Sequence, residues 1–192
     1  MNFIKKHSLP IFLILASLSL AILGEDLTKY LIYNRSEIGD AQLWRFITAH
    51  LVHLGWNHLW LNLSVLVIIW FLVKDFLSIK LWWLVALISS IGISLGLYLF
   101  MSELQWYVGL SGLLHSLLAC GAVIGVSKGK KEFIFLLIFV FIKIIYEQFY
   151  GSLNMELIRG DVVVNAHFYG VVMGLVCIFG FVVLKRFKST DF

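Results

Sequence analysis

The sequence has little of what a water-soluble protein needs. Only 14% of its 192 residues are charged, it contains one proline and two cysteines, and 61% of it is hydrophobic, with a mean hydropathy of +0.96. Soluble domains average about 25% charged residues, so this composition excludes a soluble globule, a disordered chain, a disulfide scaffold, a coiled coil and collagen. Both cysteines, Cys120 and Cys177, lie inside apolar runs and are expected to be buried hydrophobes.

Apolar runs long enough to cross a bilayer recur along the chain, and none shows strand-like alternation. They predict an all-α membrane protein with six transmembrane helices in a single domain, residues 1–192. The segment 25–46 is the longest loop, and its leucine and aromatic residues indicate that it lies on the outer membrane surface. The expected spans are residues 9–24, 51–73, 81–101, 107–127, 133–150 and 162–184.

The basic residues are distributed unevenly between the two sides of this topology. Of the 15, ten lie in segments on one side, four lie in segments on the other, and Lys143 lies within a span. The positive-inside rule therefore predicts cytoplasmic amino and carboxy termini. The net charge of +4 is explained by topology, and no nucleic-acid partner is expected. The ten are Lys5, Lys6, Lys74, Lys80, Lys128, Lys130, Lys131, Lys185, Arg186 and Lys188.

Several polar residues are expected at one depth beneath the outer membrane face. Polar groups inside a bilayer are costly and usually face the bundle interior. Ser111 and His167 each lie about five residues from the outer end of their span, roughly 7 Å deep at 1.5 Å per residue. His58 and Asn62, four residues apart, share one face of the second span. The topology thus predicts that these four side chains form one layer.

The residue types in this layer favour acyl transfer. Serine is a weak nucleophile unless a base such as histidine removes its proton, which makes Ser111 and His167 the candidate catalytic pair. The oxyanion formed on attack needs donors, and the Ser111 N–H, Asn62 and His58 are candidates. Gly109 leaves the backbone beside Ser111 open to a substrate. Ala166, Gly170 and Gly174 form a ridge of small residues that predicts close helix packing.

Other polar residues near this layer have two interpretations each. His50 and His53 either make structural hydrogen bonds in the outer loop or support the site. His115 lies four residues after the serine, and either supports the site or replaces His167 as the base. Lys143 and Glu147, again four apart, either neutralise each other within the span or recognise substrate.

In this order and spacing, the residues resemble the rhomboid family of intramembrane serine proteases. The resemblance implies a six-helix core, a Ser111–His167 dyad without an acidic third member, and an oxyanion site made by His58, Asn62 and the Ser111 N–H. It also implies a mechanism without metal or cofactor, and transmembrane protein substrates that enter sideways from the lipid bilayer. The residues that carry it are Trp44-Arg45, His53, His58, Asn62, Gly109-Leu110-Ser111-Gly112, Ala166-His167, Gly170 and Gly174.

One position departs from typical rhomboids, where an aromatic residue four positions after the serine often packs on the catalytic histidine. This chain has His115 there, so the orientation of the base is expected to differ. His115, Lys143, Glu147-Gln148 and the segment 165–170 are similar to the rhombosortase branch. That similarity implies a bacterial inner-membrane enzyme that processes carboxy-terminal Gly-Gly sorting tails. Glu147 would contact the substrate or an acceptor amine, and the outcome would be transfer or hydrolysis.

Four alternatives remain open on the sequence alone. The first two are a general rhomboid protease of single-span substrates and a non-catalytic rhomboid-like chaperone. The third is a metal-dependent protein, which the lack of an HExxH motif disfavours. Its ligands would be His53, His58, His115 and His167. The fourth is a small transporter, for which the sequence offers no inverted repeat.

Overall fold

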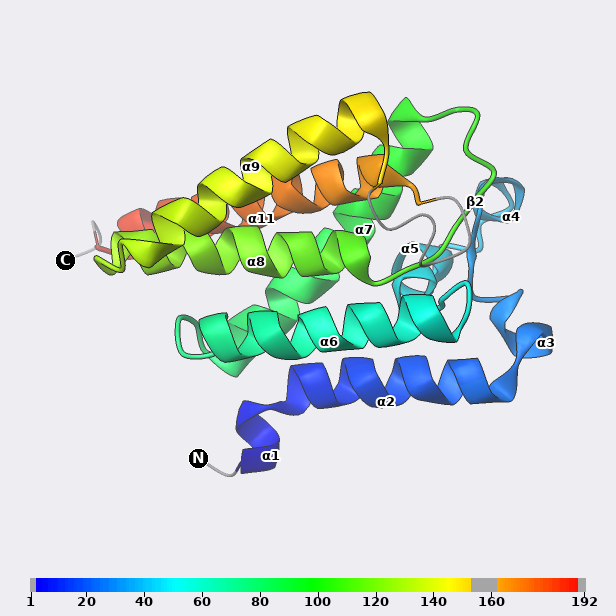
Figure 1. Ribbon diagram of the computed structural model, residues 1–192, viewed down its shortest axis with the longest axis horizontal. Coiled ribbons are helices and arrows are strands. Elements are labelled where there is room, and N and C mark those ends of the chain that lie inside the picture. Colours follow the sequence, from blue (N-terminus) through cyan, green and yellow to red (C-terminus); the bar gives the residue numbers. More distant parts are fainter. Residues whose placement is uncertain (1–2, 153–161, 190–192) are drawn as a thin grey trace.

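The computed structural model describes residues 3–152 and 162–189, and in the carboxy-terminal helix it describes side chains as far as residue 182. The chain is mostly helical (Figure 1). Within these residues, six long helices make up the bundle: α2 (Ser8–Leu23), α6 (Trp56–Val73), α7 (Ile79–Phe100), α8 (Ser111–Ser127), α9 (Glu132–Tyr150) and α11 (Val164–Ser189).

Short elements precede α2, connect α2 to α6 and connect α7 to α8. They are α1 (Phe3–Lys6), α3 (Glu25–Thr28), β1 (Tyr33–Asn34), α4 (Arg35–Gly39), α5 (Arg45–Thr48), the 3-10 turn η1 (Ala49–Leu51) and β2 (Trp106–Tyr107). Strands β1 and β2 pair antiparallel, with Tyr33 opposite Tyr107. Arg45 is buried, and its guanidinium donates to the carbonyls of Lys29 and Ile32. These bonds hold the two ends of the long loop together.

The helices confirm a multi-pass membrane protein. Among the described residues, α6, α7, α9 and the Val164–Val182 part of α11 are long and apolar enough to cross a bilayer, while α2 and α8 are apolar but shorter. The fourth expected span began at residue 107, whereas α8 begins at Ser111, because the preceding chain is extended as β2 and pairs with β1. The second began at residue 51, whereas α6 begins at Trp56, because η1 and a turn come first.

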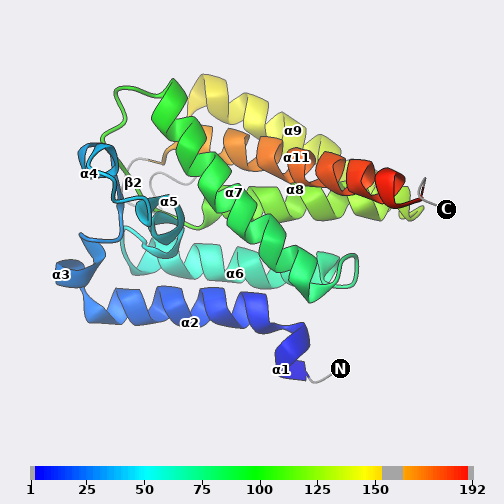
Figure 2. The ribbon, with the colours of Figure 1, turned by 180° about the vertical axis from the view of Figure 1, so that it is seen from behind.

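Helix α8 lies at the centre of the bundle, with α6 along one side and α9 and α11 along the other (Figures 1 and 2). The expected ridge of small residues on α11 faces α8. A Cβ atom on Gly174 would lie 2.5 Å from the Ser116 carbonyl oxygen, and one on Gly170 would overlap the Gly112 carbonyl. Glycine is required at both positions because the two backbones approach so closely.

The loops gather at two ends of the bundle. The α6–α7 and α8–α9 connections, the start of α2 and the end of α11 lie at one end, and the short elements from α3 to β2 lie at the other (Figure 1). Among the described residues, most of the basic ones lie in the elements and loops of the first end, including Lys6, whose ammonium is 2.6 Å from the Asp75 carboxylate. This separation agrees with the charge distribution that the sequence predicted.

Candidate functional site

Ser111 and His167 come together at the end of the bundle opposite the basic loops. The Ser111 Oγ lies 2.8 Å from His167 Nε2, although 56 residues separate them. Ser111 is the first residue of α8, and His167 lies in the first turn of α11. Both therefore lie at the starts of their helices, not five residues inside as the sequence predicted. The difference follows from the later starts of both helices, α8 at Ser111 instead of residue 107 and α11 at Val164 instead of residue 162.

The loop before Ser111 is held by two hydrogen bonds to its backbone. The Tyr107 hydroxyl donates to the Gly109 carbonyl at 2.7 Å, and the Gly109 N–H donates to the Ala49 carbonyl at 3.1 Å. Gly109 has a backbone φ angle of +127°, which residues with a Cβ atom rarely adopt. A Cβ atom there would also lie 2.8 Å from His58 Cε1. Gly109 therefore lets the His58 ring lie against the turn that presents Ser111.

The second nitrogen of His167 contacts an acidic side chain. Its Nδ1 lies 2.8 Å from Glu147 Oε2, on α9. The resemblance implied a dyad without an acidic neighbour, and the structure differs because α9 turns Glu147 toward α11. The Glu147 side chain is only 1% exposed, and its other oxygen is 2.6 Å from Lys143 Nζ. The mutually neutralising pair therefore forms, and this burial argues against direct substrate recognition by Glu147.

His115 lies against the same histidine. Its ring stacks on the His167 ring, with centroids 4.4 Å apart and planes at 19°. Its Nδ1 is 2.7 Å from the Ser111 carbonyl oxygen, and its Nε2 is 3.1 Å from Lys143 Nζ. Both ring nitrogens are thus engaged away from the Ser111 hydroxyl, which argues against His115 as the base. An imidazole here takes the stacking position that an aromatic ring occupies in typical rhomboids.

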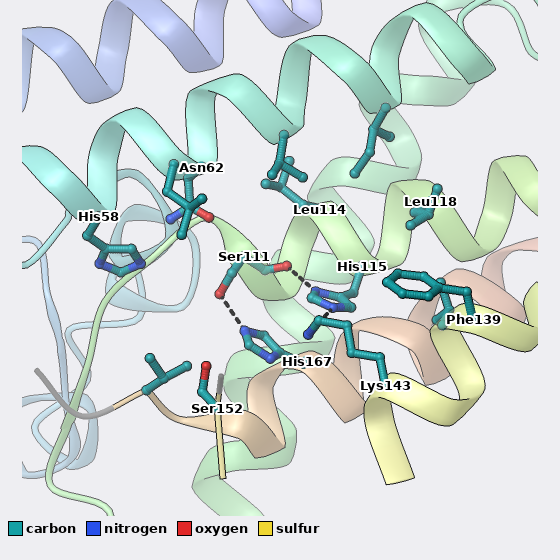
Figure 3. Close-up of a pocket in the computed structure, with 15 residues that line it drawn as sticks. His58, Asn62, Ser111, Leu114, His115, Leu118, Phe139, Lys143, Ser152 and His167 are labelled. Carbon is teal, nitrogen blue, oxygen red and sulfur yellow. Dashed lines mark hydrogen bonds between the residues drawn. The ribbon is translucent and has the colours of Figure 1, made fainter. Parts of the chain in front are cut away.

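Two side chains of α6 supply donors near Ser111. The Leu54 N–H donates to His58 Nδ1 at 3.4 Å, so in the neutral ring the proton is on Nε2. The Asn62 Nδ2 atom is buried, and within the described residues it has no hydrogen-bond partner. An unsatisfied buried amide is costly. Both residues line the pocket that contains Ser111, where a developing oxyanion would accept from them (Figure 3).

This pocket has a volume of about 220 Å³ and lies between α6, α8 and α9. Figure 3 shows Ser111, His167, His58 and Asn62 grouped at one end. Farther along α8, most of the lining side chains are apolar, among them Leu114, Leu118 and Phe139, and the two polar ones there are His115 and Lys143. The pocket therefore joins a polar end at Ser111 to an apolar groove.

The potential ligand atoms of His115, Glu147 and His167 lie within 4.8 Å of one another, close enough to share a metal ion. The Lys143 ammonium is hydrogen-bonded to His115 Nε2 and Glu147 Oε1, two of the three groups. A metal ion would have to compete with this cation. His53, a ligand in the metal-dependent alternative, donates from Nδ1 to the Leu51 carbonyl at 3.2 Å. The geometry favours proton transfer over metal binding.

His50 and His53 lie outside the membrane-spanning helices. His50 Nε2 is 3.0 Å from the Ser90 carbonyl, so His50 makes a structural bond between η1 and α7. Burial lowers the pKa of His50 to about 4. Burial, and then the neighbouring His58 ring 5.0 Å away, lower the pKa of His53 to about 3. Tyr107, which anchors the serine loop, was missed by the sequence reasoning because an aromatic residue at a span end gives no distinct signal.

A bundle of apolar helices that presents a hydrogen-bonded serine and histidine to a pocket defines a multi-pass membrane protein with a serine-hydrolase type of site. The Rhomboid domain family model matches residues 40–185, and the chain belongs to that family. Rhomboid family proteins are generally intramembrane serine proteases that act on membrane proteins within the bilayer. A search of curated proteins finds no match to this chain.

Proposed function

We propose that the protein is a metal-independent intramembrane serine endopeptidase, with Ser111 as nucleophile and His167 as general base. The observation that carries this proposal is the 2.8 Å contact between the Ser111 Oγ and His167 Nε2, formed between two different helices. A serine that only packed or bonded to its own helix would have no reason to meet an imidazole whose other nitrogen is held by a carboxylate.

The proposed reaction begins when the Ser111 Oγ attacks a peptide carbonyl of the substrate and His167 Nε2 takes the hydroxyl proton. The oxyanion accepts hydrogen bonds from the Asn62 amide, the His58 Nε2–H and the Ser111 N–H. Because the Ser111 N–H belongs to the start of α8, the helix dipole favours negative charge there. His167 then protonates the leaving amine, the peptide bond breaks, and water hydrolyses the acyl-enzyme.

The pocket supports a transmembrane substrate. Its polar end at Ser111 would receive an extended, unwound segment, and its apolar groove would receive the hydrophobic residues that follow. Val65 of α6 and Phe139 of α9 line the groove and are also exposed on the bundle surface. A substrate helix can therefore approach from the lipid between α6 and α9.

The proposed topology has six spans with both termini in the cytoplasm of a bacterium and the site near the outer face of the inner membrane. The segregation of basic side chains to the end opposite Ser111 supports this orientation. Helices α2 and α8 have 16 and 17 residues. They would complete their crossings with flanking residues or a locally thinner bilayer.

The proposed substrate is a carboxy-terminal Gly-Gly sorting tail on an exported protein, with release by hydrolysis or by transfer to an amine. Glycines expose backbone amides and unwind from a helix at little cost, which suits a narrow pocket. Co-expression with a Gly-Gly-tailed exported protein tests this specificity, with the same protein carrying Ala-Ala as the control. Processing of both tails would favour the general rhomboid protease instead.

Cleavage itself is tested with purified protein in liposomes and a single-span substrate. Ser111→Ala and His167→Ala are each expected to lower the rate at least 10³-fold. Ser127→Ala, at the far end of α8, is expected to cleave like the wild type. If Ser111→Ala retains the cellular effect of the wild type, the protein is a non-catalytic chaperone and the proposal fails.

A further inference from the structure

Glu147 is a buried carboxylate that the proposed reaction leaves without a role. Its Oε2 is 2.8 Å from His167 Nδ1, and its Oε1 is 2.6 Å from Lys143 Nζ. Burying an ionised carboxylate is costly unless its oxygens are paired, and here each oxygen has a charged or polar partner. Because neither oxygen is open to the pocket, the carboxylate acts on its neighbours and not on a substrate.

The hydrogen bonds of His115 fix the position of its proton. The Ser111 carbonyl can only accept, so His115 Nδ1, 2.7 Å away, carries the hydrogen. The lone pair on Nε2 then accepts from the Lys143 ammonium, 3.1 Å away. Lys143 thus donates to a neutral imidazole on one side and to Glu147 on the other, which holds Glu147 in its ionised form.

The same reasoning fixes the proton of His167. An ionised carboxylate can only accept, so His167 Nδ1 carries the hydrogen and its Nε2 lone pair faces the Ser111 hydroxyl. This is the tautomer that a general base requires. With the proton on Nε2 instead, the ring would donate to Ser111 and could not accept its proton.

We propose that Glu147 is the positioning residue of a Ser111–His167–Glu147 triad and that Lys143 holds its carboxylate in place. Glu147 fixes the tautomer of His167 and stabilises the imidazolium that forms when Nε2 takes the proton of Ser111. The proton moves only from Oγ to Nε2, so the hydrogen on Nδ1 stays in place and Glu147 stays ionised. The expected effect of Glu147 on the cleavage rate rests on the proposed function. Its expected effect on the tautomer of His167 does not.

The test combines two measurements on the full chain in micelles. Nitrogen-15 NMR of labelled histidine reports which His167 nitrogen carries hydrogen, with the signal assigned by its loss in His167→Ala. Cleavage of a single-span substrate gives kcat and KM separately. The variants are Glu147→Leu, Glu147→Asp and the double variant Lys143→Met/Glu147→Leu. The control is Glu132→Leu, the same change at the exposed start of α9.

In the wild type and Glu147→Asp, His167 is expected to carry hydrogen on Nδ1. In Glu147→Leu the hydrogen moves to Nε2, and kcat falls about 10²- to 10⁴-fold with KM within about threefold. Glu147→Asp recovers part of this loss, and Glu132→Leu matches the wild type. The double variant leaves no unpaired lysine, so its thermal stability is expected near wild type while its kcat stays low.

Three results overturn the inference. They are a wild-type His167 with hydrogen on Nε2, a tautomer that Glu147→Leu leaves unchanged, and a double variant with wild-type kcat, since Glu147 would then only neutralise Lys143. The failure of the proposed function looks different. In that case the tautomer depends on Glu147 as expected, but no cleavage depends on Ser111.

Discussion

The imidazole of His115 stacks on the imidazole of His167, with ring centroids 4.4 Å apart. The two rings come from different helices, α8 and α11, and the stack covers one face of the proposed base. It leaves the edge of His167 free for its two hydrogen bonds, to Ser111 and Glu147. His115 therefore restricts rotation of the ring that must stay aligned with the serine.

Substitution of His115 tests whether stacking is its main contribution. Ring pairs contribute about 0.5–1.5 kcal/mol beyond the area they bury. We expect His115→Phe to keep kcat within about threefold of wild type, and His115→Ala to lower it about 10-fold. Single-turnover cleavage of a membrane-anchored peptide measures both. Equal, large losses in the two variants would show that the polar bonds to Lys143 and Ser111 matter more than the stack.

The buried Nδ2 atom of Asn62, which has no hydrogen-bond partner in the described part of the chain, leads to a second prediction. If it donates to the oxyanion, Asn62→Ala lowers kcat about 10²- to 10³-fold and leaves KM nearly unchanged, because the bond forms only in the transition state. Asn57→Ala, on the exposed first turn of α6, is the matched control. A rise in KM without a fall in kcat would instead assign Asn62 to ground-state substrate binding.

The close contact between α8 and α11 is expected to stabilise the folded protein. Gly174→Ala would place a methyl group 2.5 Å from the Ser116 carbonyl oxygen, so the helices must separate, and we expect the free energy of unfolding to fall by about 1–3 kcal/mol. Gly180→Ala, on the same helix, meets no atom within 4 Å and is expected to be tolerated. Thermal unfolding in micelles compares the two. Equal melting temperatures would contradict the close packing.

Acid is expected to lower the free energy of unfolding because His50 binds a proton more readily in the unfolded chain. Its pKa is about 4 in the folded chain and about 6.5 when unfolded, so between these values the unfolded chain binds more protons. The free energy of unfolding therefore falls as the pH drops from 6.5 toward 4, by about 2 kcal/mol at pH 5. His50→Asn cannot titrate, and we expect its stability to change less between pH 7 and pH 5. An identical acid dependence in wild type and variant would exclude His50 as the cause.

The sequence was enough to predict the helical membrane fold and the meeting of Ser111 and His167. Evenly spaced spans bring alternate helix starts to one face, so two residues at equivalent positions share a level whatever their separation. The acidic partner of His167 was not predictable in the same way. It depends on how far α9 is rotated about its own axis, because a small rotation would turn Glu147 into the lipid.

The start of α8 was also beyond the sequence pattern. Residues 107–110 are apolar enough to continue the helix, and hydropathy alone included them in the span. The helix does not begin there because Tyr107 lies in strand β2 and pairs with Tyr33, a contact between distant segments. That pairing, together with Gly109, places Ser111 at the helix terminus, where its N–H has no partner within the helix. Long-range contacts of this kind have no local signature.

Labelling with a fluorophosphonate tests whether His167 activates Ser111. The reagent forms a covalent bond to an activated serine without needing a substrate, and mass spectrometry of the digested protein identifies the modified residue. We expect modification of Ser111 in the wild type and in Ser127→Ala, with labelling at least 10²-fold slower in His167→Ala. Labelling of a different serine, or of Ser111 at the same rate without His167, would contradict this activation.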